Sequence, residues 1–308
     1  TYFGLPARAI VGRSIGERVL AMGDMGISAI RARQLIRRIG AGVILGTGGF
    51  VSGPGVMGAG LAGRPAVIME PNVVAGAANR WLSRWATVAA VAARETGSQL
   101  RCPVEETGIP IRSEFAVGAE TASLEGPLQI LVLGGSQGAR QLNQLLPAAI
   151  GALALARPGM QVTHQVGASG LDETQAAYKQ QDLQGIDISL VPFLEDVPQA
   201  MRQAHLVVSR AGAITLAEIC AMGRAALLLP LSLAGSHQVG NARRLVNAGC
   251  AESLASDEVT PERLAESLTR LTEDRVRLQR MGEAASSLAR PRASVEIANL
   301  VEKAIGRG

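Results

Sequence analysis

Short apolar runs alternate with longer amphipathic stretches along most of the chain. In the second half we expect strands at residues 129–133, 161–165, 188–191, 206–208, 226–231 and 251–254. The runs 129–133, 206–208 and 226–231 are rich in apolar aliphatic residues and too short for typical helices, which is the pattern of strands buried on both faces. Helical patterns separate most of them, and strands that alternate with helices predict parallel βαβ units. We therefore expect an α/β fold with a parallel sheet in this half.

The first half shows the same type of pattern with less regularity. Strands are expected at 43–45, 66–69, 87–91 and 104–108, and helices at 14–39 and 79–85, with two more at 274–288 and 294–305 near the end of the chain. The apolar stripe of the first helix is expected to consist of Ala32, Leu35, Ile36 and Ile39. A nucleotide-binding α/β domain usually begins with a strand and a glycine turn, whereas the first clear strand here begins at residue 43. We therefore expect that the chain lacks an N-terminal βαβ portion and that its first domain is incomplete.

The stretch 206–241 contains two of these apolar runs and the loops that follow them. The first run ends at a small-residue turn, Ser209 to Ala213, which leads into a helical pattern that stops at Gly223. The second run ends at a loop that holds His237 and Gln238. Both loops would lie at the carboxyl edge of the sheet, where ligands bind in open α/β sheets, and a helix N-terminus favours an anion. We interpret this stretch as the site for the phosphates and sugar of a nucleotide.

A second turn of the same kind, Gly134 to Gly138, follows the run 129–133. Its glycines permit close approach of a ligand to the backbone, and Ser136 adds a hydroxyl donor. Neither this turn nor the glycine-rich loop at 46–55 has G-x-G-x-x-G spacing, so a dinucleotide site is only weakly indicated. The turn favours ligand binding over a plain strand-to-helix connection.

Four polar residues have two interpretations each, and the sequence leaves both open. Thr215 and Glu218 have the spacing of a capping box, but Glu218 could instead accept hydrogen bonds from a ribose diol. Arg112 could pair with a diphosphate or form a surface salt bridge. His237 could contact a ligand or only cover the surface. His164 and His205, which lie at strand ends, are expected to be structural.

Composition narrows the class of protein. A chain of 308 residues with 47% hydrophobic residues suggests two domains with buried cores. Only 3% of the residues are aromatic, which argues against stacking platforms for single-stranded nucleic acid. The three cysteines have neither disulfide nor metal spacing, and the chain has no Asp-x-Asp motif, so we expect no metal and no cofactor. No apolar run approaches the roughly 20 residues of a membrane-spanning helix.

Charge is concentrated at the N-terminus. Residues 1–40 contain seven Arg against Glu17 and Asp24, a net charge of +5, whereas the whole chain carries +4. A basic face of this kind could meet an anionic lipid surface or an anionic substrate. It could equally be a solvated helix face.

Six motifs together resemble one family of enzymes. They are LGTGGFVSGP (45–54), MEPNVVAG (69–76), GIPIR (108–112), LVLGGSQGAR (131–140), SRAGAITLAEI (209–219) and HQVGNA (237–242). In this order they resemble MurG, the UDP-N-acetylglucosamine:undecaprenyl-diphospho-muramoylpentapeptide N-acetylglucosaminyltransferase family. The resemblance covers essentially the whole chain. It implies two Rossmann-like domains that face each other across a cleft, which is the GT-B-type glycosyltransferase architecture.

The resemblance also implies a division of the chain. Residues 1–114 would form a partial N-terminal domain on the acceptor and membrane side, and residues 115–293 a C-terminal UDP-sugar-binding domain. Residues 294–308 would form a C-terminal helix that crosses back to the first domain.

The implied activity is the inverting transfer of GlcNAc from UDP-GlcNAc to the C4 hydroxyl of lipid I, which gives lipid II in peptidoglycan synthesis and so serves cell-wall biogenesis, cell shape and cell division. The implied partners are UDP-GlcNAc, the undecaprenyl-diphosphate-linked muramoylpentapeptide and the anionic inner-leaflet surface, with no nucleic acid. The implied location is peripheral, on the cytoplasmic face of the bacterial plasma membrane.

Residue by residue, the resemblance implies a donor site and an acceptor side. The donor positions are Asn72, Arg112, Ser136, Leu194, Ala213, Ile214, Thr215, Leu216, Ala217, Glu218 and Gln238. The candidate acceptor-side positions are Gly48, Gly49, Ser52 and Glu70. Glu218 would bind the ribose, Ser136 and the helix N-terminus at Ala213 to Thr215 the diphosphate, and Gln238 the sugar.

The chain departs from the family pattern in several places. The family's opening GGTGGH loop, whose His is a candidate base, has no counterpart here, so the catalytic residues are unknown. Met69 and Pro71 replace the His and Gln of the usual His-Glu-Gln-Asn, and Ile109 and Ala225 replace an Asn and a Pro. We therefore expect weak UDP binding and poor transfer. A UDP-GlcNAc 2-epimerase and a non-catalytic UDP-sugar-binding protein are the alternatives.

Overall fold

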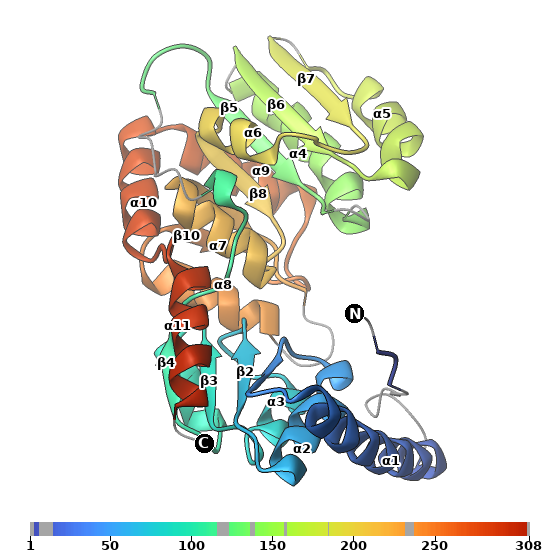
Figure 1. Ribbon diagram of the computed structural model, residues 1–308. Coiled ribbons are helices and arrows are strands. Elements are labelled where there is room, and N and C mark those ends of the chain that lie inside the picture. Colours follow the sequence, from blue (N-terminus) through green and yellow to red (C-terminus); the bar gives the residue numbers. More distant parts are fainter. Residues whose placement is uncertain are drawn as a thin grey trace. The chain divides into compact units, whose positions relative to one another are not determined.

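The computed structural model describes residues 3–5, 15–115, 123–135, 139–156, 159–183, 185–231 and 237–306, with the backbone alone at 15–22 and 156. The chain divides into two compact units. Unit 1 consists of Thr1–Pro110 and Arg292–Gly308, and unit 2 of Ile111–Pro291. Each unit contains a wholly parallel sheet (Figure 1). The predicted α/β class is confirmed.

The sheet of unit 2 has six strands in the order β10-β9-β8-β5-β6-β7. These are β5 (Gln129–Leu133), β6 (Met160–Gln165), β7 (Ile186–Val191), β8 (Leu206–Ser209), β9 (Ala225–Leu228) and β10 (Ala251–Ser253). From β5 the chain continues outward to β6 and β7, and then returns to the other side of β5 at β8. The switch point of the topology therefore lies between β5 and β8, where the two loops leave the sheet in opposite directions and open a crevice.

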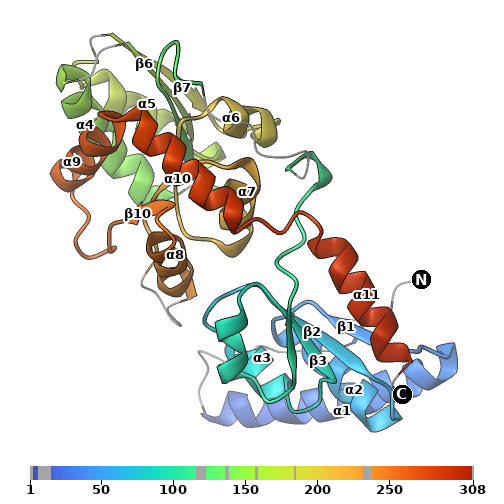
Figure 2. The same ribbon diagram turned by 90° about the vertical axis from the view of Figure 1, so that its left-hand side faces the viewer.

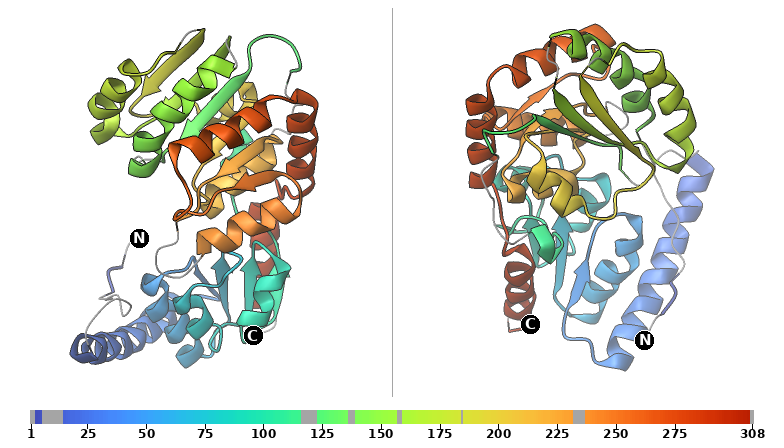
Figure 3. Two further views of the ribbon diagram at one scale, coloured as in Figure 1. Left: turned by 180° about the vertical axis from the view of Figure 1, so that it is seen from behind. Right: turned by 90° about the horizontal axis from the view of Figure 1, so that it is seen from above.

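Helices cover both faces of this sheet (Figure 3). On one face lie α4 (Arg140–Ala156), α5 (Leu171–Lys179) and α9 (Pro261–Thr272), and on the other α6 (Val197–Gln203), α7 (Ala213–Met222) and α8 (His237–Asn247), while α10 (Arg275–Ser287) contributes to both. Along β5, Ile130 and Val132 pack into the first layer, and Leu131 and Leu133 into the second. Since alternate side chains of a strand point to opposite faces, a continuous apolar run is what a doubly covered strand requires.

Unit 1 has a smaller sheet in the order β1-β2-β3-β4. Its strands are β1 (Ile44–Gly46), β2 (Ala66–Glu70), β3 (Val88–Val91) and β4 (Val104–Glu106). One face is covered by α1 (Ile15–Ile39), α2 (Gly53–Ala62) and α3 (Ala77–Leu82). The last helix, α11 (Ala293–Ile305), packs on the other face, where Ile297, Leu300 and Ala304 meet Val67, Val88 and Ala90 (Figure 2).

The helix α1 packs on α2 through a narrow contact. A Cβ on Gly58 would lie 2.6 Å from the Cβ of Ala32, so only glycine permits this close approach of the two backbones. The buried stripe contains Ala32 and Ile36 as predicted, but Ile39 is 54% exposed. The expectation for Ile39 was wrong because the helix ends there and the chain turns at Gly40, whose φ is +67°.

Two expectations about the stretch after β8 were also wrong. The strand predicted at 226–231 ends at Leu228, shortly before Pro230, which has no N–H to continue the ladder. His237 and Gln238 lie in the first turn of α8 and not in a loop. Because the helix begins with these two polar residues, the apolar pattern of the sequence does not show where it starts.

Candidate functional site

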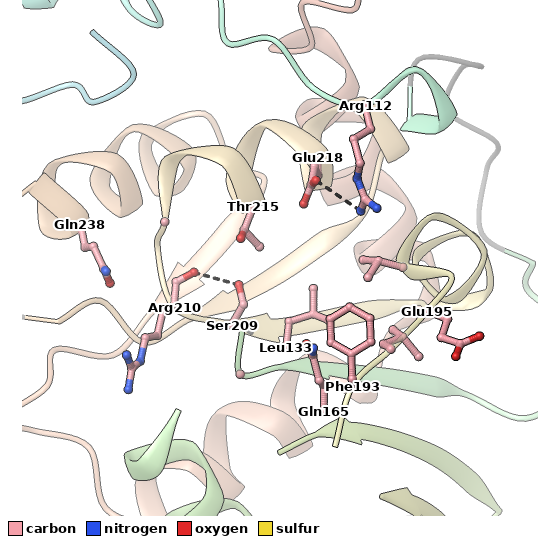
Figure 4. A pocket seen from close by; sticks show the side chains of 15 residues that line it. Arg112, Leu133, Gln165, Phe193, Glu195, Ser209, Arg210, Thr215, Glu218 and Gln238 are labelled. Atoms are coloured by element: carbon pink, nitrogen blue, oxygen red, sulfur yellow. Dashed lines mark hydrogen bonds and ion pairs between the residues drawn. The ribbon is translucent and has the colours of Figure 1, made fainter. Parts of the chain in front are cut away.

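A cavity of about 380 Å³ opens in unit 2 at the carboxyl ends of β5, β6 and β8 (Figure 4). It is lined by Arg112, Leu133, Gly134, Gly135, Gln165, Phe193, Leu194, Glu195, Val197, Ser209, Arg210, Gly212, Thr215, Glu218 and Gln238. The cavity lies at the switch point of the sheet, which is where open α/β folds bind their ligands. Five predicted donor positions line it, namely Arg112, Leu194, Thr215, Glu218 and Gln238.

One wall of the cavity comes from the segment between β7 and α6. Phe193, Leu194 and Glu195 line it, and Phe193 is 62% exposed. Asp196 holds the segment in place, because its Oδ1 accepts a hydrogen bond of 2.8 Å from the N–H of Gln199 and so caps α6. Leu194 was predicted here, whereas Phe193 and Glu195 were missed. The signal that could have found them is their position directly after a strand end.

A carboxylate and a guanidinium lie together on the next part of the wall. The Nη2 atom of Arg112 is 3.8 Å from Oε1 of Glu218, and the Arg112 guanidinium also stacks 5.0 Å from the ring centroid of Phe115. The side chain of Glu218 is only 12% exposed, against 52% for Arg112. Burial raises the pKa of Glu218 above its usual value, and the charge of Arg112 partly lowers it again. Figure 4 shows this ion pair as a dashed line between the two side chains.

The helix α7 begins without a side-chain cap. Its N-cap residue is Gly212, and no side chain there accepts a hydrogen bond from the first turn. Thr215 and Glu218 are the third and sixth residues of the helix, so the capping-box interpretation was wrong. The first-turn N–H groups beside the cavity form the kind of helix N-terminus that binds anions.

The remaining predicted positions on α7 do not line the cavity. Leu216 is buried in the core, and Ile214 is 58% exposed. Ala213 and Ala217 are half-buried. Side chains on successive residues of a helix point in different directions, so only some of the run Ala213 to Glu218 can face one cavity.

The glycine turn after β5 forms the floor of the cavity with Gly134 and Gly135. Gly135 has a φ of +77°, a conformation that favours glycine. Ser136, the predicted hydroxyl donor, lies outside the described residues. On the neighbouring strand end, the Ser209 hydroxyl donates a 3.0 Å hydrogen bond to the backbone carbonyl of Arg210.

Arg210 was missed by the sequence analysis, although its side chain lines the cavity. Burial lowers the pKa of its guanidinium. At the same end of the site, Oε1 of Gln238 accepts a 3.0 Å hydrogen bond from the N–H of Leu231. This bond fixes the amide of Gln238, because its carbonyl oxygen is turned toward the backbone. His237, the first residue of α8, does not line the cavity.

The predicted acceptor-side residues and Asn72 lie in unit 1. Glu70, which is 2% exposed, is the centre of their hydrogen-bond network. Its Oε1 accepts bonds of 3.0 Å from both the N–H and Nδ2 of Asn72, and its Oε2 accepts bonds of 2.8 Å from the N–H of Gly76 and from Nδ2 of Asn79. All four bonds are local, so Glu70 holds the loop after β2 in shape.

A side-chain hydrogen bond stabilises the glycine-rich loop after β1. The hydroxyl of Ser52 donates a 2.7 Å hydrogen bond to the carbonyl of Gly48. Gly48 and Gly49 have φ values of +99° and +69°, which other residues rarely adopt. The loop therefore depends on glycine at both positions.

Within the described residues, the structure contains neither a metal-binding cluster nor a membrane-spanning helix. No group of three or more His, Cys, Asp or Glu side chains in the described part could hold a metal ion. None of the described helices is both long and apolar enough to cross a membrane.

The two parallel-sheet units correspond to the two domains of one glycosyltransferase family. Residues 129–297 match the glycosyltransferase family 28 C-terminal domain, and residues 4–91 match its N-terminal domain. The chain belongs to the MurG family of N-acetylglucosamine transferases, and the predicted resemblance, GT-B-type fold and enzyme class are confirmed.

The relatives that show this family cover most of the chain. A UDP-N-acetylglucosamine–N-acetylmuramyl-(pentapeptide) pyrophosphoryl-undecaprenol N-acetylglucosamine transferase of Marinobacter nauticus is 42% identical over 273 residues, 86% of this chain and 73% of that protein. The enzyme of the same name from Sorangium cellulosum is 38% identical over 314 residues, 95% of this chain and 77% of that protein. The crystal structure of Acinetobacter baumannii MurG has a TM-score of 0.80 at 32% identity and covers 94% of this chain and 82% of that one.

A more distant structure shares only the fold. A putative UDP-N-acetylglucosamine 2-epimerase from Listeria monocytogenes has a TM-score of 0.68 at 12% identity, over 96% of this chain and 82% of that one. The architecture is therefore common to transferases and epimerases, and the activity has to be argued from the site.

Proposed function

We propose that this enzyme transfers GlcNAc from UDP-GlcNAc to the C4 hydroxyl of lipid I and forms lipid II with inversion, in peptidoglycan synthesis. The observation that carries the proposal is the cavity of unit 2, in which a largely buried carboxylate, a glycine turn and an uncapped helix N-terminus meet. The names of the relatives supply the donor sugar and the acceptor.

Each part of UDP-GlcNAc has a complementary part of the cavity. The wall of Phe193 and Leu194 suits a flat base, and the Glu218 carboxylate suits the two hydroxyls of a ribose. The turn at Gly134 and Gly135 and the N-terminus of α7 offer N–H groups to a diphosphate. By resemblance we assign Gln238, which lines the cavity, to the GlcNAc and Ser136 to the diphosphate.

Beyond binding the donor, the transfer reaction requires unit 2 only to stabilise the departing UDP. As the bond between C1 of GlcNAc and the β-phosphate oxygen breaks, its electron pair remains on the departing UDP. The C4 oxygen of the acceptor forms the new bond to C1 and loses its proton to a base. Preorganised N–H groups and a cation stabilise the charge that develops on UDP. No base is assigned, and Asn72, Gly48, Gly49 and Ser52 remain proposed contacts on unit 1.

We further propose that unit 1 contacts the anionic inner leaflet, with the protein bound peripherally to the cytoplasmic face of the plasma membrane. Helix α1 supports this, since Ile27 and Ile30 are 55% and 52% exposed. Arg31, Arg37 and Arg38 are exposed on the same helix. Exposed apolar side chains beside arginines suit an interfacial helix on anionic lipid.

The decisive experiment uses radiolabelled UDP-GlcNAc with and without a soluble lipid I analogue. The proposed function requires a labelled disaccharide product and one UDP released per transfer. Formation of UDP-ManNAc from UDP-GlcNAc alone would favour the epimerase, and binding of UDP-GlcNAc without either product would favour the non-catalytic alternative. The expected poor rate is measured against the Marinobacter nauticus relative in the same assay.

A further inference from the structure

Gln165, the last residue of β6, lines the cavity of unit 2 and is only 5% exposed. Within the described residues, the amide of its side chain makes no hydrogen bond. The other glutamine of the cavity, Gln238, is bonded to the N–H of Leu231. An amide that is removed from water without a partner is costly, and a ligand that supplies the missing hydrogen bonds offsets this cost. Gln165 is therefore a group whose surroundings call for a ligand.

The sheet places Gln165 in a row of strand ends beneath the cavity. In the parallel ladders, Leu133 on β5 is in register with Ser209 on β8 and with Gln165 on β6, and Gln165 is in register with Val191 on β7. Residues in register point to the same face of the sheet, and Leu133 points to the face covered by α6 and α7. The preceding residue, His164, points to the opposite face, where α5 packs. The amide of Gln165 is thus directed to the face on which the cavity opens.

The place of Gln165 in the cavity indicates which part of a donor it meets. Figure 4 shows Gln165 near the end that holds Phe193 and Glu195, away from Gln238 at the other end. Phe193 follows Val191 by two residues, so it leaves the strand that neighbours β6. The carboxylate of Glu195 lines the same end and favours a neutral group over a phosphate there.

We propose that Gln165 recognises the nucleobase of the donor through the polar edge formed by ring positions 3 and 4. This inference rests on the proposed function and names a residue that selects its substrate. The amide oxygen accepts a hydrogen bond from N3–H of uracil, and the amide NH₂ donates one to O4. After half a turn the same amide fits cytosine, so this contact selects a pyrimidine with a polar edge and not uracil alone. Flat contact with the wall of Phe193 and Leu194 supplies the rest of the binding.

The test compares two ligands that differ only at this edge. They are UDP and the diphosphate of pyridin-2-one riboside, in which C–H groups replace N3–H and the C4 carbonyl. The wild type should bind UDP about tenfold to a hundredfold more tightly, the value of two hydrogen bonds. Gln165→Met, which keeps the shape of the side chain without its amide, should bind both ligands within about twofold of each other. Gln175→Met, at an exposed residue of α5, is the matched control and should keep the wild-type preference. Calorimetric titration measures all of these affinities.

Thermal unfolding separates recognition of the base from a structural role. The unfolding temperature of ligand-free Gln165→Met should not fall, because the substitution replaces an unpaired buried amide by an apolar side chain of similar volume. Gln165→Leu is a second apolar variant, which is titrated in the same way if the Met variant does not fold.

Three results would overturn the inference. An unchanged preference for UDP in Gln165→Met would mean that the amide does not contact the base. Equal weakening of both ligands would place the side chain on the ribose or the diphosphate. A lower unfolding temperature with an unchanged preference would make the role structural. The proposed function fails separately: a wild type that binds UDP but transfers no GlcNAc contradicts the activity, while the preference between the two ligands still decides the role of Gln165.

Discussion

The guanidinium of Arg112 lies 3.8 Å from the carboxylate of Glu218, and each residue changes what the other can do. Burial alone would favour the neutral form of Glu218. A neutral carboxylic acid donates one hydrogen bond and accepts fewer hydrogen bonds than a carboxylate does. The charge of Arg112 acts in the opposite direction on the pKa of Glu218. The pair therefore supplies an ionised acceptor whose own side chain is only 12% exposed.

Replacing Glu218 by Gln should remove recognition of the ribose and leave stability intact. The wild type is expected to prefer UDP over 2′-deoxy-UDP by about tenfold, the value of one charged hydrogen bond, and Glu218→Gln should bind both alike. The unfolding temperature should not fall, because Glu218 does not cap α7. Competition titration and calorimetry measure the two effects. A lower unfolding temperature with an unchanged preference for UDP over 2′-deoxy-UDP would instead mean that Glu218 has a structural role.

The same pair predicts how UDP affinity depends on pH. Because binding uses the carboxylate, affinity should decline as the pH falls through the raised pKa of Glu218. Arg112→Met removes the group that lowers this pKa, so the decline should begin at a higher pH than in the wild type. A titration series from about pH 8 to about pH 5 would show the shift, with both proteins compared at each pH because protonation of the terminal UDP phosphate in this range affects both alike. Superimposable profiles would mean that Arg112 has no effect on Glu218.

His164 predicts acid sensitivity of unit 2. Burial lowers the pKa of His164 from 6.5 to about 3, and its Nδ1 lies 3.2 Å from the hydroxyl oxygen of Tyr178. Below pH 6.5 the His164 imidazole gains a proton in the unfolded chain but not in the folded chain. The buried neutral imidazole therefore costs no stability above pH 6.5, and the free energy of unfolding decreases as the pH falls toward 3. At about pH 5 the loss is about 2 kcal/mol.

Urea unfolding at about pH 7.5 and at about pH 5 measures this loss of stability. His164→Phe should lose about 2 kcal/mol less than the wild type between the two conditions. Tyr178→Phe, which keeps the buried imidazole, should retain the full acid sensitivity. The pKa of His205 is also lowered by burial, and its contribution cancels because all three proteins contain it. Equal losses in wild type and His164→Phe would contradict the assignment.

The order of strands and helices could be read from the sequence because strands covered on both faces must be continuously apolar. Residues 129–133 were predicted as a strand and form β5 with the same ends. Errors arose where this pattern fails. The helix α8 begins with two polar residues, of which Gln238 lines the cavity, and the strand β9 ends before Pro230.

The site was predictable only where a motif or resemblance marks it. Glu218 and Gln238 were found in this way, and both line the cavity. Arg210 was not found, because a single arginine after a strand has no spacing that distinguishes a paired from an unpaired guanidinium. Likewise, no local pattern brings Arg112 to Glu218, since the two residues are far apart in the chain.

Glu70 should matter for the stability of unit 1. Its buried carboxylate accepts four hydrogen bonds, two from each side of the loop after β2. Glu70→Gln replaces one acceptor oxygen by a donor that would face N–H groups, at a cost of about 1–3 kcal/mol. The matched control is Glu105→Gln on β4, where the side chain is exposed. Thermal unfolding should distinguish the two variants, and equal midpoints would mean that the loop tolerates the loss.

The proposed membrane contact predicts a dependence on both apolar and basic residues of α1. Ile27→Glu with Ile30→Glu should reduce binding to phosphatidylglycerol vesicles at any salt concentration. Arg37→Gln with Arg38→Gln should reduce it about tenfold or more at low salt, since each arginine near an anionic surface contributes about 1 kcal/mol. Val276→Glu, at an exposed apolar residue of α10, is the control. Binding that none of these variants changes would place the contact elsewhere.

Gln238 should determine recognition of the sugar and not of the nucleotide. Its Oε1 is held by the N–H of Leu231, which leaves the amide NH₂ as the group directed away from the backbone. Gln238→Leu removes that donor at similar side-chain length, so the KM for UDP-GlcNAc should rise about tenfold while the Ki for UDP stays within about twofold. Gln238→Asn, which keeps the amide but shortens its reach, should give an intermediate KM. Competition assays with UDP, UDP-glucose and UDP-GlcNAc measure the difference, and a parallel rise in the Ki for UDP would instead place Gln238 on the diphosphate.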